Sequence, residues 1–185
     1  MARSHKLPHF KMRSIPNINT ARLSLRGMRP DDFDRYAHIW SMPEVVRQIG
    51  GTPWSRGQAW TSFLRNAGHW QMTGFGQWAI VEQGSRTIIG QTGFFYVDRK
   101  LDAELGAYPE AGWMLTPDVR GKGYAYEAAK AAHEWLDRVI PTKLVAVVAP
   151  GNAASVHLAK ALNYQPVRDA EIEGRPVVLY LRSGP

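Results

Sequence analysis

Two glycines stand at the junction between a predicted strand, 110–115, and a predicted helix, 121–138. The first amides of a helix have no partner inside it, and the helix dipole places partial positive charge there. Glycines let a ligand approach such a backbone closely, which favours a phosphate or pyrophosphate group. The junction combines these glycines with two cations in the segment Arg120, Gly121, Lys122, Gly123, Tyr124 and Ala125. We therefore predict an anion-binding loop around which the strand and the helix must be arranged.

The spacing within this loop narrows the choice of phosphate ligand. It does not match G-x-x-x-x-G-K-[ST], which excludes the nucleoside-triphosphate loop. Nor is it G-x-G-x-x-G within a βαβ unit, so a dinucleotide-binding fold is poorly supported. A glycine-rich helix start without any ligand remains an alternative on this evidence alone.

Hydrophobic periodicity divides the rest of the chain into strands and helices. Period-two alternation or continuous apolar runs predict strands at 20–27, 76–82, 87–97, 110–115, 144–149 and 176–181. Helical spacing predicts helices at 32–40, 55–72 and 121–138, and a short one from Asn152 or Ser155 to Leu162. The pattern predicts a mixed α/β (α+β) fold with a partly antiparallel central sheet flanked by helices. We expect residues 1–14 to form a flexible basic tail and residues 15–185 to form one domain.

The same periodicity predicts which helix faces point inward. For the helix at 55–72 the expected core residues are Ala59, Trp60, Phe63, Leu64 and Ala67. For the helix at 121–138 they are Tyr124, Ala128, Ala131, Trp135 and Val139. We also expect Asn163 to end the last helix in a left-handed conformation.

Composition excludes several classes of protein. The 185 residues include no cysteine, which excludes disulfides, cysteine–metal sites and an acyl-cysteine intermediate. The six histidines show no metal-binding spacing, so no metal is expected. No apolar run reaches the roughly 18–20 residues of a membrane span, and no apolar segment follows the basic start. We therefore expect a cytoplasmic protein without membrane contact.

The net charge of +7 is compatible with nucleic acid, with an anionic small molecule or with no specific partner. Part of the excess lies in the first 13 residues, and the remainder is scattered rather than clustered. Because proteins that read nucleic acids usually carry dense Lys/Arg clusters, no nucleic-acid partner is expected. A nucleic-acid-binding protein is kept as a third and least supported hypothesis.

The surroundings of the loop resemble a known family. Glu-Ala-Gly-Trp-Met-Leu-Thr-Pro at 110–117 precedes the loop, and a buried strand at 145–150 follows the helix. Next come Asn-Ala-Ala-Ser at 152–155 and Leu-Asn-Tyr at 162–164. With the Arg-x-x-Gly-x-Ala loop, this order and spacing resemble the GNAT superfamily of N-acetyltransferases, in the branch of ribosomal-protein N-terminal (RimJ/RimL-type) acetyltransferases. The resemblance covers residues 18–182, including 20–26 and Pro-Glu-Val at 43–45.

This resemblance implies acetyl-CoA as co-substrate and a primary amine, on a protein N-terminus or a small molecule, as acceptor. Direct attack in a ternary complex is expected, and a homodimer is left open. The backbone amides of Gly121, Lys122, Gly123, Tyr124 and Ala125 are expected to hold the pyrophosphate, with Arg120 beside them. The other implied cofactor-binding residues are Met114, Leu115 and Thr116 through their backbones, Asn152 on the pantetheine arm and Ser155 near the sulfur. Asn152 is also a plausible helix N-cap.

Catalysis requires a base, an oxyanion donor and an acid. Glu110 is the candidate base, directly or through a water, although an exposed or ion-paired glutamate is an equal alternative. A backbone N–H near Met114 is the candidate oxyanion donor. The tyrosine that the family often places seven residues after the asparagine is Ala159 here. Ser155 is then the candidate acid, and His157 a weaker one because residues two apart on a helix do not share a face.

Ala159 keeps a second hypothesis open, a catalytically weak acyl-CoA-binding protein that acts as a sensor or interaction module. Since a thiol has a pKa of about 8.5, the leaving thiolate is tolerably stable without a strong acid. Acetyl transfer therefore remains the leading hypothesis.

Overall fold

The computed structural model describes residues 14–47, 49, 51–97 and 104–185. It contains one eight-stranded sheet in the order β1-β2-β3-β4-β5-β6-β8-β7. The strands are β1 (Ile18–Asn19), β2 (Leu23–Arg26), β3 (Gln77–Glu82), β4 (Ile88–Phe95), β5 (Glu110–Leu115), β6 (Leu144–Val148), β7 (Gln165–Ile172) and β8 (Arg175–Arg182). Neighbouring strands are antiparallel except β5 and β6, which are parallel. The predicted tail lies outside the described residues, apart from its last residue.

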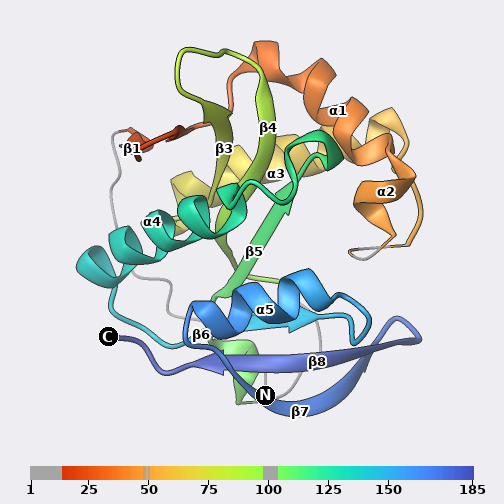
Figure 1. Ribbon diagram of the computed structural model, residues 1–185, viewed down its shortest axis with the longest axis vertical. Coiled ribbons are helices and arrows are strands. Elements are labelled where there is room, and N and C mark those ends of the chain that lie inside the picture. Colours follow the sequence, from red (N-terminus) through yellow and green to blue (C-terminus); the bar gives the residue numbers. More distant parts are fainter. Residues whose placement is uncertain (1–13, 48, 50, 98–103) are drawn as a thin grey trace.

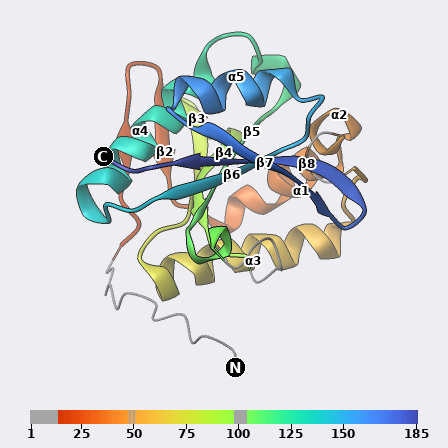
Figure 2. The same cartoon turned by 90° about the horizontal axis from the view of Figure 1, so that it is seen from below.

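Helices cover both faces of this sheet. They are α1 (Phe33–Ser41), α2 (Pro43–Val46), α3 (Arg56–Thr73), α4 (Tyr124–Val139) and α5 (Ala153–Ala161). Short 3₁₀ turns occur at Pro30–Asp32, Leu105–Ala107 and Pro117–Val119. In the view from below, α4 and α5 lie on one side of the strands, and α1 and α3 lie on the other (Figure 2). The predicted fold class, a mixed, partly antiparallel sheet flanked by helices, is confirmed.

Helix α3 has the predicted serine N-cap and ends at a glycine, but its buried face differs from the prediction. Ser55 accepts a hydrogen bond from Gln58 N, and Gly74 ends the helix with φ +80°. Ala59 and Phe63 are buried as predicted, whereas Trp60 is 47% exposed. Leu64 and Ala67 are also exposed. The helix buries a more polar face instead, which comprises Ser62, Asn66, Trp70 and Thr73.

Polar partners explain why α3 can bury this face. The Ser62 hydroxyl accepts a hydrogen bond from Tyr36 Oη at 3.1 Å, and Trp70 Nε1 donates to Gln77 O at 3.1 Å. A buried polar group costs little free energy once it is hydrogen-bonded. The face of α4 is likewise rotated: the buried residues are Ala128, Ala129, Ala132, His133 and Leu136, and only Ala128 belongs to the predicted set.

Two strands depart from the predicted pattern. The strand expected at 20–27 is the shorter β2, and the turn before it, in which Thr20 Oγ1 donates to Leu23 O at 3.2 Å, connects it to β1, which was not predicted. Strand β7 was not predicted, because its residues are mostly exposed and lack apolar alternation. It is an edge strand whose ladder runs to β8 on one side, so burial does not constrain most of its side chains.

The sheet opens between β5 and β6. Their parallel ladder has a single register pair, Glu110 with Val145, beside a hydrogen bond from Val145 N to Pro109 O at 2.9 Å. Beyond this pair the strands diverge, and β5 runs at a steep angle to β6, β7 and β8 (Figure 1). This divergence creates the gap in which the candidate site lies.

Candidate functional site

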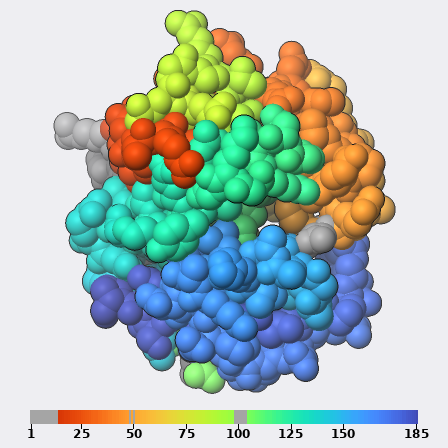
Figure 3. Space-filling view, in the orientation of Figure 1, coloured from red at the N-terminus to blue at the C-terminus, as the bar shows by residue number. Residues whose placement is uncertain are grey.

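A groove of about 860 Å³ lies where β5 and β6 separate. Its walls come from α2, the end of β5, the loop before α4, the first turn of α4 and the length of α5. In the space-filling view the hollow is visible between the α4 and α5 segments (Figure 3). The groove therefore brings the predicted anion-binding loop together with Asn152 and Ser155, which follow it about thirty positions later in the chain.

The loop at the start of α4 presents backbone donors to the groove. Gly121 and Gly123 both have φ +78°, a left-handed conformation that favours glycine. The first α4 hydrogen bond runs from Glu127 N to Gly123 O at 3.1 Å, so the amides of residues 124–126 precede it. A Cβ added at Gly121 would meet no atom within 4 Å. This open space, faced by helix amides, fits a pyrophosphate group.

Arg120 has a structural role that the sequence did not reveal. Its Nη2 donates to Glu44 O at 3.0 Å and lies 3.5 Å from Leu115 O, so the guanidinium ties the loop to α2 and to the end of β5. Lys122 does not line the groove. Its carbonyl accepts a hydrogen bond from Arg22 Nη1 at 2.9 Å, and its ammonium lies 5.9 Å from the centre of the Tyr124 ring. Arg120 therefore lines the groove, whereas Lys122 contributes charge beside it.

Pairing with β4 decides which backbone groups of β5 face the gap. Thr116 N donates to Ile89 O at 2.8 Å, and Met114 is register partner of Gln91. Because hydrogen-bonded and non-hydrogen-bonded pairs alternate in an antiparallel ladder, the backbones of Met114 and Thr116 bond towards β4. The N–H and C=O groups of Trp113 and Leu115 therefore point towards β6. Of the three backbones expected to bind pantetheine, that of Leu115 therefore faces the gap, and so does the backbone of Trp113.

Asn152 and Ser155 sit together at the start of α5. Asn152 Oδ1 accepts a hydrogen bond from Ser155 N at 3.0 Å, so the predicted N-cap is confirmed. This leaves the Asn152 amide NH₂ as a donor. The Ser155 hydroxyl accepts a hydrogen bond from Trp113 Nε1 at 3.1 Å. All three residues line the groove. The link to Trp113 escaped sequence analysis, because a contact across 42 positions leaves no signal in local periodicity.

Ala159 and Glu110 lie outside the groove lining, whereas His157 is part of it. Ala159 is fully buried and does not line the groove, so the position where the family often has a tyrosine faces the core here. His157 lines the groove from an exposed position. Glu110 is partly buried and not a groove-lining residue. By the period of a strand, its side chain shares a face with Met114, opposite to Trp113.

Behind Trp113 lies a buried pair of polar rings. Tyr164 Oη and His133 Nε2 are 2.8 Å apart, and His133 Nδ1 lies 2.6 Å from Ala129 O. A carbonyl only accepts, so Nδ1 carries the proton and Nε2 accepts from the tyrosine. Burial lowers the pKa of His133 to about 4 and raises that of Tyr164. Both groups are therefore neutral near pH 7.

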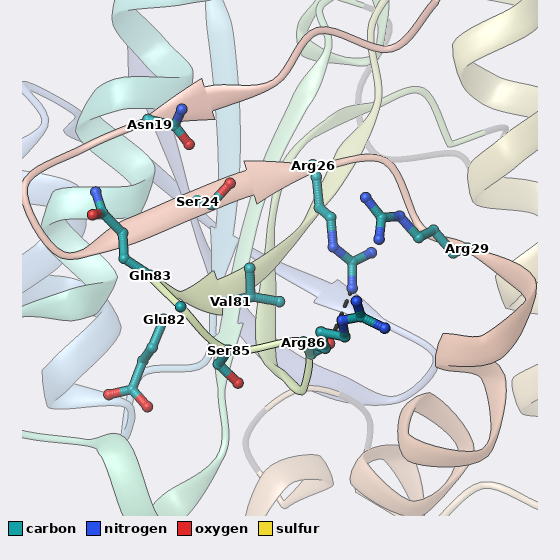
Figure 4. Close-up of a pocket in the computed structure, with 10 residues that line it drawn as sticks. Asn19, Ser24, Arg26, Arg29, Val81, Glu82, Gln83, Ser85 and Arg86 are labelled. Carbon is teal, nitrogen blue, oxygen red and sulfur yellow. Dashed lines mark hydrogen bonds between the residues drawn. The ribbon is translucent and has the colours of Figure 1, made fainter.

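A second cavity of about 390 Å³ lies away from the groove, where β2 meets the end of β3 and the β3–β4 turn. Arg26, Arg29 and Arg86 gather at one end of it (Figure 4). Arg26 donates two hydrogen bonds of 2.6 and 2.8 Å to Asp32. This pairing offsets the cost of burying the guanidinium. This cavity shares no lining residue with the groove. Within the described ranges, no cluster of metal-binding side chains occurs.

The sequence of residues 22–165 matches the family model described as Acetyltransferase (GNAT) domain. The chain belongs to the GNAT acetyltransferase family. It is 27% identical to an N-acetyltransferase of uncharacterized function, p20, from Bacillus licheniformis, over 91% of this chain and 96% of that protein. Among solved structures, an acetyltransferase from Agrobacterium tumefaciens is 28% identical with a TM-score of 0.77, over 91% and 95% of the two chains.

The GNAT fold also extends to more distant relatives. RimL, the ribosomal L7/L12 alpha-N-protein acetyltransferase solved with coenzyme A, has a TM-score of 0.74 at 16% identity, over 91% of this chain and 98% of its own. The ribosomal-protein acetyltransferases are thus among the structural neighbours, as the sequence resemblance predicted. No helix in the described part of this GNAT protein has the length and hydropathy of a membrane span.

Proposed function

We propose that this GNAT protein transfers the acetyl group of acetyl-CoA to a primary amine, on a protein N-terminus or a small molecule, within a ternary complex. The observation that carries the proposal is the groove. It joins a pyrophosphate-sized cradle at the start of α4 to the gap between β5 and β6, where Ser155 lies. A diphosphate followed by an extended arm and a thioester has the chemistry that such a groove accepts.

Each part of the groove has a role in binding. The amides of residues 121–125 hold the pyrophosphate, and Arg120 and Lys122 add positive charge. The backbone groups of Leu115 and Trp113 that point towards β6 pair with the amides of the pantetheine arm. The NH₂ of Asn152, whose Oδ1 accepts from Ser155 N, donates to a carbonyl of the same arm. Met114 also lines the groove.

The chemistry divides between the two faces of β5. Acetyl-CoA supplies an activated thioester. An amine at neutral pH is mostly protonated, and Glu110 accepts this proton, directly or through a water, on the face shared with Met114. An N–H of Trp113 or Leu115 in the gap stabilises the charge that develops on the thioester oxygen. Ser155, on the opposite face, donates a proton to the sulfur.

A catalytically weak acyl-CoA-binding protein is the second candidate, favoured by the absence of a tyrosine at position 159. This absence carries less weight in the folded protein, because Ala159 faces the core and lies outside the groove lining. The groove supplies a different hydroxyl, that of Ser155.

The experiment that separates these candidates measures acetyl-CoA binding by calorimetry and release of free thiol with a panel of amines and peptides. Acetyl transfer predicts binding together with acceptor-dependent thiol release. Binding without turnover on any acceptor would support the sensor, and salt-sensitive binding of DNA or RNA without CoA binding would contradict both.

A further inference from the structure

The Ser155 hydroxyl has one bonding direction fixed by the protein. Trp113 Nε1 donates to Ser155 Oγ at 3.1 Å, and an indole nitrogen can only donate. A hydroxyl has two lone pairs and one proton, so this contact occupies one lone pair and leaves the proton. Within the described residues no acceptor is found for that proton, and Ser155 lines the groove.

This arrangement is unusual for a serine in the first turn of a helix. Such hydroxyls often donate back to a carbonyl of the same or the preceding turn. Among the described residues Ser155 makes no such bond: its oxygen accepts from Trp113 Nε1, and its backbone N–H donates to Asn152 Oδ1. Its hydroxyl proton is therefore available to a group that occupies the groove.

Trp113 is itself held in place from behind. Its ring packs edge-on against Tyr164, with ring centres 6.3 Å apart and planes at 69°. Tyr164 is fully buried, and its hydroxyl is anchored by His133, which is anchored in turn by the carbonyl of Ala129. The chain of contacts fixes the indole to α4, so its N–H direction does not depend on the bound substrate.

We propose that Trp113 is a positioning residue that orients the Ser155 hydroxyl so that its proton points at the sulfur of the bound acyl-CoA. The inference rests on the proposed function and goes beyond it by assigning a role to the indole. The indole acts only through Ser155, and its Nε1–H does not touch the reacting atoms.

The proton balance of this step is complete. The neutral amine forms a bond to the thioester carbon, and the nitrogen becomes positively charged. As the carbon–sulfur bond breaks, the sulfur takes the Ser155 proton, and the second lone pair of the hydroxyl takes a proton from the nitrogen. The products are the amide and free CoA thiol, and the serine returns to its starting state without becoming an alkoxide.

The test uses CoA itself and needs no acceptor. A hydroxyl that donates to the thiolate favours the charged form, so the thiol pKa of CoA bound to the wild-type protein should lie below the free value of about 8.5. The titration follows the ultraviolet absorbance of the thiolate in the complex. In Trp113→Phe, which keeps an aromatic ring and loses the N–H, this pKa should rise by about one pH unit.

Double substitution distinguishes positioning from packing. Ser155→Ala should raise the thiol pKa at least as far as Trp113→Phe, and the double variant should go no further, because the indole acts through the hydroxyl. Turnover should follow the same rule, with kcat lowered about 100-fold by Ser155→Ala, about 10-fold by Trp113→Phe and no more than 100-fold by both. Additive effects would mean that Trp113 acts by packing and would overturn the inference.

Trp78→Phe is the matched control. It removes an indole hydrogen bond of similar length, 2.8 Å to Pro16 O, from a residue that does not line the groove. It should leave the bound thiol pKa unchanged. A wild-type protein that binds CoA with an unshifted thiol pKa would refute the role of Trp113 alone, whereas a failure to bind CoA would contradict the proposed function and the inference together.

Discussion

His133 gives the fold a dependence on pH that can be calculated. The residue is 4% exposed, and burial is the main reason that its pKa falls from 6.5 to about 4. Among the charges near it, Arg182 acts in the same direction and Asp137 opposes it. The folded protein therefore keeps this imidazole neutral at a pH where the unfolded chain already binds a proton. Stability from this source is fully present above the unfolded pKa of 6.5 and is lost as pH falls towards 4.

The size of the effect follows from linkage. One pKa unit corresponds to about 1.4 kcal/mol, so the full shift from 6.5 to about 4 is worth about 3.5 kcal/mol well below pH 4. About 2.5 kcal/mol of this is lost between pH 7 and about pH 4.5, which lies only about two units below the unfolded pKa. His133→Gln retains a donor and an acceptor but does not titrate. It should therefore lose about 2.5 kcal/mol less than the wild type over this interval.

Urea unfolding followed by circular dichroism at a series of pH values measures this difference directly. Carboxylates also lose stability in acid, so the comparison between variants, and not the wild-type curve alone, carries the result. His38→Gln, on the exposed side of α1, is the control and should track the wild type. If the curves for wild type and His133→Gln stay parallel down to about pH 4.5, the buried neutral imidazole is refuted.

Two further predictions concern the proposed base and the buried ion pair. Glu110→Gln should lower the rate of acetyl transfer at neutral pH, and the rate should recover as pH approaches the pKa of the acceptor amine, where the amine loses its proton unaided; an unchanged pH–rate profile would remove Glu110 as the base. Asp32→Ala leaves Arg26, whose side chain is 8% exposed, without its carboxylate and should cost about 3 kcal/mol of unfolding free energy. Asp34→Ala breaks an exposed ion pair with Arg56 and should cost less than about 1 kcal/mol by the same chemical denaturation; equal losses would contradict the distinction.

The sequence was most informative where function and local chemistry coincide. The loop before α4, the Ser55 and Asn152 caps and the left-handed Asn163, with φ 67°, are all set by residues close together in the chain. Their glycines, hydroxyls and amides suit few other backbone conformations. This is why the glycine-containing loop before α4 and the order of strands and helices around it could be predicted; anion binding by the loop stays a prediction.

The remaining features depend on contacts between distant segments. The exposed side chains of Trp60 and Leu64 have the spacing of a core face, and only the polar partners of Ser62 show which face is buried. The Trp113–Ser155 contact depends on how far β5 and β6 diverge, which a single register pair determines. Similarly, only the pairing with β4 shows that the Thr116 N–H donates to Ile89 O in the neighbouring strand rather than pointing into the gap.

Binding of acetyl-CoA to two glutamate variants tests the central claim, that the loop at the start of α4 holds the pyrophosphate. Gly123→Glu places bulk and negative charge in the cradle at φ +78°, whereas Gly174→Glu places the same side chain at φ +76° in the β7–β8 turn, with nothing within 4 Å. Because both glutamates adopt nearly the same left-handed φ, the backbone strain is equal in the two variants. A difference in acetyl-CoA affinity measured by calorimetry therefore reports only where the glutamate lies. We predict wild-type affinity for Gly174→Glu and a loss of about 100-fold or more for Gly123→Glu, since about 3 kcal/mol of charged hydrogen bonding is removed. Equal affinities in the two variants would contradict the account.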